Sequence, residues 1–376
     1  MTKGGLEDVV AANSAIADII GPQGKLTYRG IDIHDLARHS SFEETTYLLW
    51  FGSLPTREAL AEFSAELASH RALPPQVLTL MKDFPRNAAP MDALRTALSA
   101  LAFYDPQARD SSRDANVAKA MRVTAQTATI VGAYEQIRRG RQPIEPEEAG
   151  SHAESFLRML FGAEPDPLYA RAMDLALILH ADHELNASTF AARVTAATLA
   201  DMYSAVVSAI GALAGPLHGG ANEQVMKMLQ KIGEPARVEA YVTERLEAHQ
   251  KISGFGHRVY RTEDPRATHL REMSRQLGEH VGNLRWYEIS RKVEEVVMQQ
   301  KHLYANVDFY SASCYFTMGI PIDMFTPVFA VSRISGWTAH ILEQYADNRL
   351  IRPRTEYVGL KDVPYLPVDR RARAAS

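Results

Sequence analysis

Four short stretches of the chain bring together histidine, carboxylate and arginine, the side chains that move protons and recognise anions. They are LHADHELNAST (179–189), GPLHGGAN (215–222), GFGHRVYRTEDPR (254–266) and NVDFYSAS (306–313). A fifth stretch, SRISGW (332–337), places an arginine inside an apolar segment. Together the five stretches supply carboxylates, imidazoles and guanidinium groups. These are the side chains that acid–base catalysis on an anionic substrate requires.

His218 follows Gly-Pro-Leu and precedes a helix that we expect to start near Asn222. The positive end of a helix dipole disfavours imidazolium, so a ring at this place stays neutral. A neutral ring can donate one N–H to a developing oxyanion. The alternative is a histidine that caps the helix and whose ring is satisfied by the backbone.

His257 and Asp308 each have two interpretations. Gly254 and Gly256 precede His257 and indicate a backbone that approaches another group closely, although an ordinary loop has the same pattern. Asp308 lies in an almost uncharged segment, where desolvation raises a carboxylate pKa towards the range of a general base. The alternative for Asp308 is a plain helix N-cap.

Arg333 is surrounded in sequence by Val, Ile, Trp and Phe, and a buried arginine needs an anionic partner. A substrate carboxylate and a distant structural carboxylate satisfy this need equally well. The run from His180 to Glu184 has two histidines at i and i+3, but it lacks the H-E-x-x-H order and a third ligand. We therefore predict no metal site.

The elements that must position these residues are helices. Apolar residues recur at helical spacing over most of the chain, including one long run from Ser188 to Leu213. A capping-box pattern begins at Ser41, and only residues 25–33 show strand-like alternation, which predicts a short hairpin. The fold class is all-α.

Two glycine- and proline-containing breaks, at 211–220 and 319–323, divide the chain. They predict a large helical domain made of residues 1–215 and 320–376, with a smaller, mobile helical domain (216–319) inserted in it. The length of 376 residues is compatible with two domains.

Composition excludes several classes of protein. A net charge of −4 gives no reason to expect a nucleic-acid partner. The longest uncharged stretch, from Met202 to Ala214, is shorter than the roughly 20 residues of a membrane span, and the N-terminus carries no export signal. The single cysteine, Cys314, excludes an internal disulfide and is typical of a cytoplasmic protein. No P-loop or G-x-S-x-G motif occurs.

In this order, within an all-helical chain, the motifs GPLHGGAN, GFGHRVYRTEDPR, NVDFYS and SRISGW resemble those of the citrate synthase family. The similarity runs from LTYRGIDI near the N-terminus to RLIRPR near the C-terminus and indicates the short dimeric type. It implies a two-domain helical fold and the condensation of acetyl-CoA with oxaloacetate, followed by hydrolysis of citryl-CoA to citrate and CoA. It implies no permanently bound cofactor, because the CoA thioester is a co-substrate.

The resemblance also implies roles for individual residues. Asp308 removes a proton from the acetyl-CoA methyl group, His218 stabilises the enolate oxygen, and His257 protonates the oxaloacetate carbonyl. The residues that match positions holding oxaloacetate are His183, Arg266, Arg333 and, from the other subunit of a homodimer, Arg352. Lys251 and Arg261 are candidates for contacts with the CoA phosphates.

Two alternatives remain open from the sequence. The 2-methylcitrate synthases share these motifs and use propionyl-CoA, and one methylene changes binding by only about 1–3 kcal/mol. A non-enzymatic helical interaction protein is the second alternative, and it predicts no release of CoA thiol.

Overall fold

Helices make up most of the computed structural model, which describes residues 4–6, 9–257 and 259–371. Arg258, in the middle of GFGHRVYRTEDPR, lies outside the described residues. The larger group of helices comprises α1 (Ile33–His39), α2 (Phe42–Phe51), α3 (Arg57–Ser69), α4 (Pro75–Lys82), α5 (Pro90–Leu101), α6 (Arg113–Arg138), α7 (His152–Phe161), α8 (Pro167–His180), α9 (Ala187–Ala196), α10 (Met202–Leu213) and α16 (Phe325–Ala346). The fold class predicted from the sequence is confirmed.

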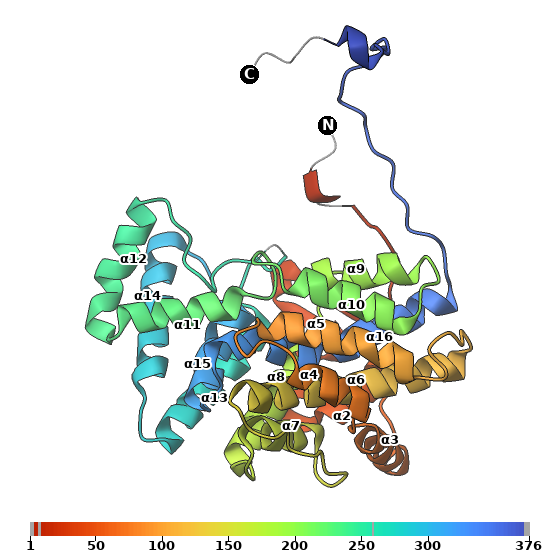
Figure 1. The fold of residues 1–376 in the computed structure, drawn as a ribbon. Coiled ribbons are helices and arrows are strands. Elements are labelled where there is room, and N and C mark those ends of the chain that lie inside the picture. Colours follow the sequence, from red (N-terminus) through yellow and green to blue (C-terminus); the bar gives the residue numbers. More distant parts are fainter. Residues whose placement is uncertain (1–3, 7–8, 258, 372–376) are drawn as a thin grey trace.

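A second group of helices follows the glycine-rich break after α10. It comprises α11 (Ala221–Ile232), α12 (Val238–Glu247), α13 (Pro265–His280), α14 (Arg285–Lys301) and α15 (Val307–Thr317). Within this group α15 packs against α11 and α13, and α12 packs against α14. Figure 1 shows α11, α12 and α14 together on one side of the molecule.

Short 3-10 turns lie between some of these elements and near the two ends of the chain. They are η1 (Gly4–Leu6), η2 (Gly21–Gln23), η3 (Ala102–Tyr104), η4 (Pro235–Arg237), η5 (Ile322–Met324) and η6 (Val368–Arg370). None of the helices in the described ranges is both long enough and apolar enough to cross a membrane.

The helix α16 lies at the centre of the larger group, with every residue from Phe325 to Ile341 buried. A helix that is buried on all sides is enclosed by its neighbours, and α16 packs against α2, α6, α8, α9 and α10. A Cβ atom at Gly336 would lie 2.3 Å from the Ala181 carbonyl oxygen, so only glycine allows this approach. The approach brings Arg333, one turn earlier in α16, next to the segment after α8.

The predicted hairpin is present as part of a three-stranded antiparallel sheet of β1 (Ala17–Ile20), β2 (Lys25–Tyr28) and β3 (Ile31–Asp32). Arg29 (φ 49°) and Gly30 (φ 84°) form its turn, and two positive φ angles are the signature of a tight type I′ hairpin. The sheet presents Tyr28, whose hydroxyl donates to the carbonyl oxygen of Asp182 at 2.9 Å. The sheet thus helps to fix the segment between α8 and α9.

The long helix predicted from Ser188 to Leu213 is wrong, because the structure breaks it into α9 and α10. Leu199 adopts a left-handed conformation (φ 61°), which interrupts the helix, and Asp201 then caps α10 by accepting from the Ser204 N–H at 2.9 Å. At the predicted capping box, Ser41 caps α2 through the Glu44 N–H. A reciprocal capping box is found instead between Ser151 and Glu154, at the start of α7.

Candidate active site

Most of the predicted site residues line a single cavity of about 740 Å³, although they come from distant parts of the chain. The residues concerned are His183, His218, His257, Arg266, Asp308 and Arg333. They come from the segment between α8 and α9, from the loops before α11 and α13, and from α13, α15 and α16. The cavity therefore lies where the two groups of helices meet.

His218 is held by α9. Its Nε2 lies 2.8 Å from the Ser188 hydroxyl, and the Ser188 backbone N–H donates to the same nitrogen at 3.3 Å. An Nε2 that accepts leaves the proton of the neutral ring on Nδ1. The helix α11 has no side-chain cap, so the interpretation of His218 as its capping residue is wrong.

Burial, followed by the positive charge of Arg333, lowers the pKa of His218 to about 4. The ring is therefore neutral at physiological pH, as the sequence predicted. The predicted cause was the dipole of α11, whereas desolvation is the largest contribution here. A neutral imidazole beside a cationic cavity is a suitable hydrogen-bond donor to an oxyanion.

His257 is fixed by the backbone of its own loop. Its Nδ1 accepts from the N–H groups of Val259 (3.0 Å) and Tyr260 (3.2 Å), so the neutral ring carries its proton on Nε2. Burial, followed by the charge of Arg266, lowers the pKa of His257 to about 4. His257 thus has one N–H, at Nε2, to offer to another molecule.

The glycines before His257 have φ angles of 82° and 79°, which side chains rarely adopt. A Cβ atom at Gly254 would lie 2.8 Å from the side chains of Phe309 and Val225. The expected close approach is confirmed, but it is an approach to α15 and α11. An ordinary, loosely packed loop is excluded at Gly254.

Asp308 is the second residue of α15, and its N–H donates to the side chain of the true N-cap, Asn306, at 3.1 Å. The interpretation of Asp308 as an N-cap is therefore wrong. Its Oδ1 is buried and accepts no hydrogen bond from any described residue. Burial raises the pKa of Asp308 to about 6, although Arg266 acts in the opposite direction. An unsatisfied carboxylate with a raised pKa is a good candidate for a general base.

Arg333 is buried, and its Nε donates to the His180 carbonyl oxygen at 2.6 Å. Among residues 4–6, 9–257 and 259–371, no carboxylate lies within 4.0 Å of the guanidinium as an ion-pair partner. The alternative of a structural salt bridge is thus wrong for the described part of the chain. Desolvation lowers the pKa of Arg333 to about 10. An anionic ligand would relieve this cost.

Arg266 is placed differently, because Asp264 already neutralises it. Its Nε and Nη2 donate to the two carboxylate oxygens at 2.9 and 2.8 Å. Burial alone would raise the pKa of Asp264, but the Arg266 charge holds it below its usual range. Asp264 also caps α13 and accepts from the Val307 N–H at 3.1 Å. It therefore links the start of α13 to the start of α15, which carries Asp308.

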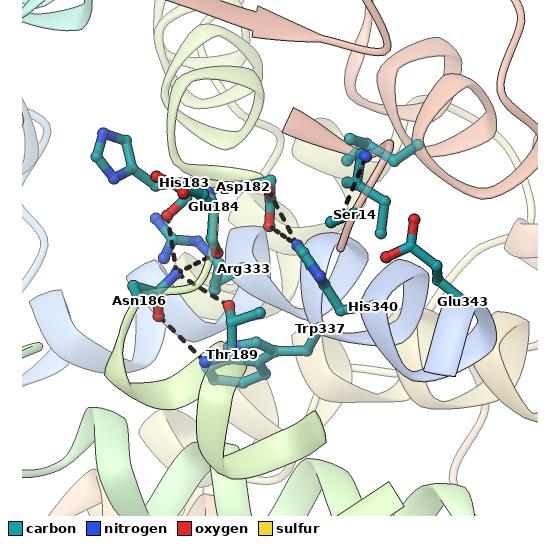
Figure 2. Close-up of polar contacts among 12 residues, drawn as sticks. Ser14, Asp182, His183, Glu184, Asn186, Thr189, Arg333, Trp337, His340 and Glu343 are labelled. Carbon is teal, nitrogen blue, oxygen red and sulfur yellow. Dashed lines mark hydrogen bonds and ion pairs between the residues drawn. The ribbon is translucent and has the colours of Figure 1, made fainter. Parts of the chain in front are cut away.

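The residues of the His180–Glu184 run point in different directions. His180 Nδ1 bonds to the Ala176 carbonyl oxygen at 2.8 Å, and Asp182 pairs with His340 at 3.2 Å. Figure 2 shows this pair, with Arg333 of α16 beside the 182–186 segment. No group of three metal-binding side chains is present in the part of the chain that the structure describes. Of the run, His183 and Glu184 line the cavity.

Sequence reasoning missed three residues of this site. They are Ser188 beside His218, Tyr260 beside His183, and Asp264 beside Arg266. Asp264 could have been found, because a carboxylate two residues before Arg266 is within reach of it. For Ser188 and Tyr260 the contacts join segments that are 30 and 77 residues apart, and no local signal indicates them.

The other three predicted residues do not line this cavity within one chain. Lys251 and Arg261 are exposed. Arg352 lines a separate cavity of about 780 Å³, formed by the N-terminal segment, the end of α16 and the chain that follows it. After Asp347 the chain extends away from the helices, as Figure 1 shows.

The known proteins that are similar to this chain include citrate synthases and 2-methylcitrate synthases. Residues 5–354 match the family described as "Citrate synthase, C-terminal domain". "Citrate synthase 2" of Bacillus subtilis (strain 168) is 52% identical over 369 residues, covering 98% of this chain and 99% of the relative. The "Citrate synthase" of Haloferax volcanii is 51% identical over 374 residues, with coverage of 98% and 99%.

A "2-methylcitrate synthase" from Shewanella oneidensis is 40% identical over 375 residues, covering 99% of this chain and 98% of the relative. Among solved structures, the ternary complex of carboxymethyl coenzyme A and oxaloacetate with citrate synthase from Thermoplasma acidophilum superposes with a TM-score of 0.92. It is 34% identical to this chain and covers 98% of both chains.

Proposed function

The chain belongs to the citrate synthase family, and from this premise we propose that its cavity condenses acetyl-CoA with oxaloacetate and hydrolyses the citryl-CoA product to citrate and CoA. The observation that carries the proposal is the convergence on one cavity of three neutral imidazoles, a buried carboxylate whose Oδ1 accepts no hydrogen bond from a described residue, and a guanidinium with no carboxylate partner among the described residues. The acyl donor is a CoA thioester that arrives as a co-substrate. No permanently bound cofactor takes part in the proposal.

The first step is removal of a methyl proton from acetyl-CoA by Asp308. A thioester α-proton is weakly acidic, so the enolate oxygen has to be stabilised while the proton leaves. His218 does this through its Nδ1–H, because Nε2 is occupied by Ser188. Arg333 adds positive potential, since it is close enough to affect the pKa of both residues.

The second step forms the carbon–carbon bond. The nucleophilic carbon of the enolate attacks the ketone carbon of oxaloacetate, and the Nε2–H of His257 protonates the ketone oxygen. The two carboxylates of oxaloacetate are held by arginines, whose planar guanidinium groups match carboxylates. Arg333 supplies a positive charge that no carboxylate of a described residue pairs with. Arg266 supplies the N–H groups of its guanidinium that Asp264 does not use, and His183 lines the same cavity.

The remaining predicted contacts require a second copy of the chain or a bound CoA. We propose a homodimer in which Arg352 of each subunit reaches the oxaloacetate of the other. The support is that the extended segment after α16 leads Arg352 away from the cavity of its own chain. Lys251 and Arg261 are exposed and stay candidates for the CoA phosphates. A cytoplasmic location is in accord with the single, buried cysteine.

The inserted segment 216–319 acts as a mobile small domain on the body formed by 1–215 and 320–376. His257, Arg266 and Asp308 belong to the segment, whereas His183 and Arg333 belong to the body. A dianion that bridges Arg266 and Arg333 draws the two together and excludes water until condensation is complete. Oxaloacetate therefore binds first.

The test is release of CoA thiol from acetyl-CoA plus oxaloacetate, measured beside propionyl-CoA and beside reactions without oxaloacetate. We expect kcat/KM for acetyl-CoA to exceed that for propionyl-CoA by about tenfold or more, the discrimination that one methylene allows. A preference for propionyl-CoA would instead identify a 2-methylcitrate synthase. Absence of thiol release with both thioesters would leave a non-enzymatic helical interaction protein.

A further inference from the structure

Tyr260 contacts two histidines of the cavity in different ways. Its backbone N–H donates to Nδ1 of His257 at 3.2 Å, and its hydroxyl lies 3.2 Å from Nε2 of His183. The three rings pack together, with centroids of Tyr260 4.6 Å from His257 and 5.6 Å from His183, and the two imidazoles 5.1 Å apart. Tyr260 is only 4% exposed, so its hydroxyl needs a partner inside the protein.

The direction of the hydrogen bond between Tyr260 and His183 follows from the protonation states. Burial raises the pKa of the Tyr260 phenol, which therefore keeps its proton. Burial also lowers the pKa of His183, followed by the charge of Arg266, so this ring is neutral. In the described part of the chain the phenol has no other hydrogen-bond partner than His183. The phenol therefore donates, and Nε2 of His183 accepts.

We propose that Tyr260 is a positioning residue, whose phenol holds His183 in the tautomer with its proton on Nδ1. An imidazole without this donor exchanges between two tautomers, and only one of them offers a donor at Nδ1. The proposal rests on the proposed function in one respect, which is that His183 helps to hold oxaloacetate. Because Tyr260 lies in segment 216–319 and His183 lies in the body, the bond also joins the two parts of the cavity.

The variant Tyr260→Phe separates the two contacts. It retains the backbone N–H groups that fix His257, and it removes only the hydroxyl that reaches His183. We expect KM for oxaloacetate to rise about three- to tenfold, the range for one neutral hydrogen bond, while kcat changes less than about threefold. Tyr134→Phe is the matched control, because the Tyr134 phenol is also buried and donates to the Ala88 carbonyl oxygen at 2.9 Å, but it does not line the cavity.

A second readout does not depend on catalysis. In full-length protein labelled with ¹⁵N-histidine, the Nε2 signal of His183, assigned with a His183→Gln variant, should have the shift of an unprotonated acceptor. In Tyr260→Phe it should move towards the average of two tautomers. An unchanged His183 spectrum together with an unchanged KM would overturn the proposal. Wild-type protein that releases no thiol but shows the tautomer shift would contradict the proposed function and leave the role of Tyr260 intact.

Discussion

The Ser188 hydroxyl lies 2.8 Å from Nε2 of His218 and also accepts from the indole N–H of Trp337 at 3.0 Å. Trp337 is part of α16 and Ser188 is the second residue of α9, so two helices of the body determine where this imidazole lies. Because the backbone N–H of Ser188 also points at Nε2, the ring presents Nδ1–H to the cavity as its donor. Ser188 thus controls the direction in which His218 can stabilise an oxyanion.

Ser188→Ala should therefore weaken enolate stabilisation without removing an acid or a base. We expect kcat to fall by roughly tenfold or more and exchange of the acetyl-CoA methyl protons with solvent to slow in parallel. Ser335→Ala is the control, because the Ser335 hydroxyl is buried in the same helix as Trp337 and, among the described residues, bonds only within that helix. Equal losses in both variants would mean that the effect is one of folding, and thermal melts distinguish this case.

Asp308→Asn tests the general base directly. The amide has nearly the same shape as the carboxylate but cannot accept the methyl proton. Activity should fall by at least about 10²-fold, the lower end of the range for acid–base catalysis, and methyl-proton exchange should vanish. Oxaloacetate binding, measured by calorimetry, should persist. Near-normal turnover would remove Asp308 from the role of base.

The pH dependence of activity should show one acidic limb, from Asp308. Its pKa is raised to about 6, and a base acts only when it is deprotonated, so kcat/KM for acetyl-CoA should decrease as the pH falls through about 6. His218 and His257 have pKa values of about 4 and stay neutral across this range. Bound oxaloacetate adds negative charge near Asp308 and raises its pKa, so the decrease in activity then occurs at a higher pH. A rate that is constant down to pH 5 at saturating oxaloacetate would contradict this assignment.

The helical class could be predicted from the sequence, because apolar spacing is a local signal. The candidate site residues could be singled out by residue type, but their roles came from the resemblance to a family and stay predictions. Whether Asp308 was a cap or a base depended on its neighbour Asn306, which takes the cap position. The break at Leu199 depended on one residue adopting a left-handed conformation, for which leucine has no preference. The bonds of Ser188 and Tyr260 to histidines depend on how distant segments pack, which no short pattern encodes.

A buried histidine remote from the cavity predicts how the protein responds to acid. Burial, followed by the charge of Arg71, lowers the pKa of His152 from 6.5 to about 3, and neither ring nitrogen has a partner in the described chain. The unfolded chain therefore takes up this proton at a higher pH than the folded chain. The free energy of unfolding should decrease as the pH falls from 6.5 towards 3, by about 2 kcal/mol at pH 5 from this residue.

His152→Phe should make the free energy of unfolding less sensitive to pH between 7.5 and 5 by about that amount. The measurement is urea unfolding at both pH values, and the change between them matters more than either value, because phenylalanine alters the packing against Phe42. His39→Phe is the control, since this ring is exposed. An unchanged pH dependence in His152→Phe would show that other groups cause the acid response.

The proposed contribution of Arg352 across a dimer interface can be tested by complementation between inactive subunits. Asp308→Ala and Arg352→Ala homodimers should each have little activity at limiting oxaloacetate. Losing one arginine–carboxylate contact costs roughly 2–5 kcal/mol of substrate interaction. In a mixed dimer, two-fold symmetry gives one site both defects and the other site neither.

Random reassortment makes about half of the dimers mixed, and each mixed dimer has one intact site of two, so about a quarter of wild-type activity should return. The two variants are refolded together with different affinity tags, mixed dimers are isolated through both tags, and thiol release is measured. Isolated mixed dimers should reach about half of wild-type activity. If their activity equals only the mean of the two parents, Arg352 serves the site of its own chain or no site, because only an exchange of arginines between subunits can restore a complete cavity.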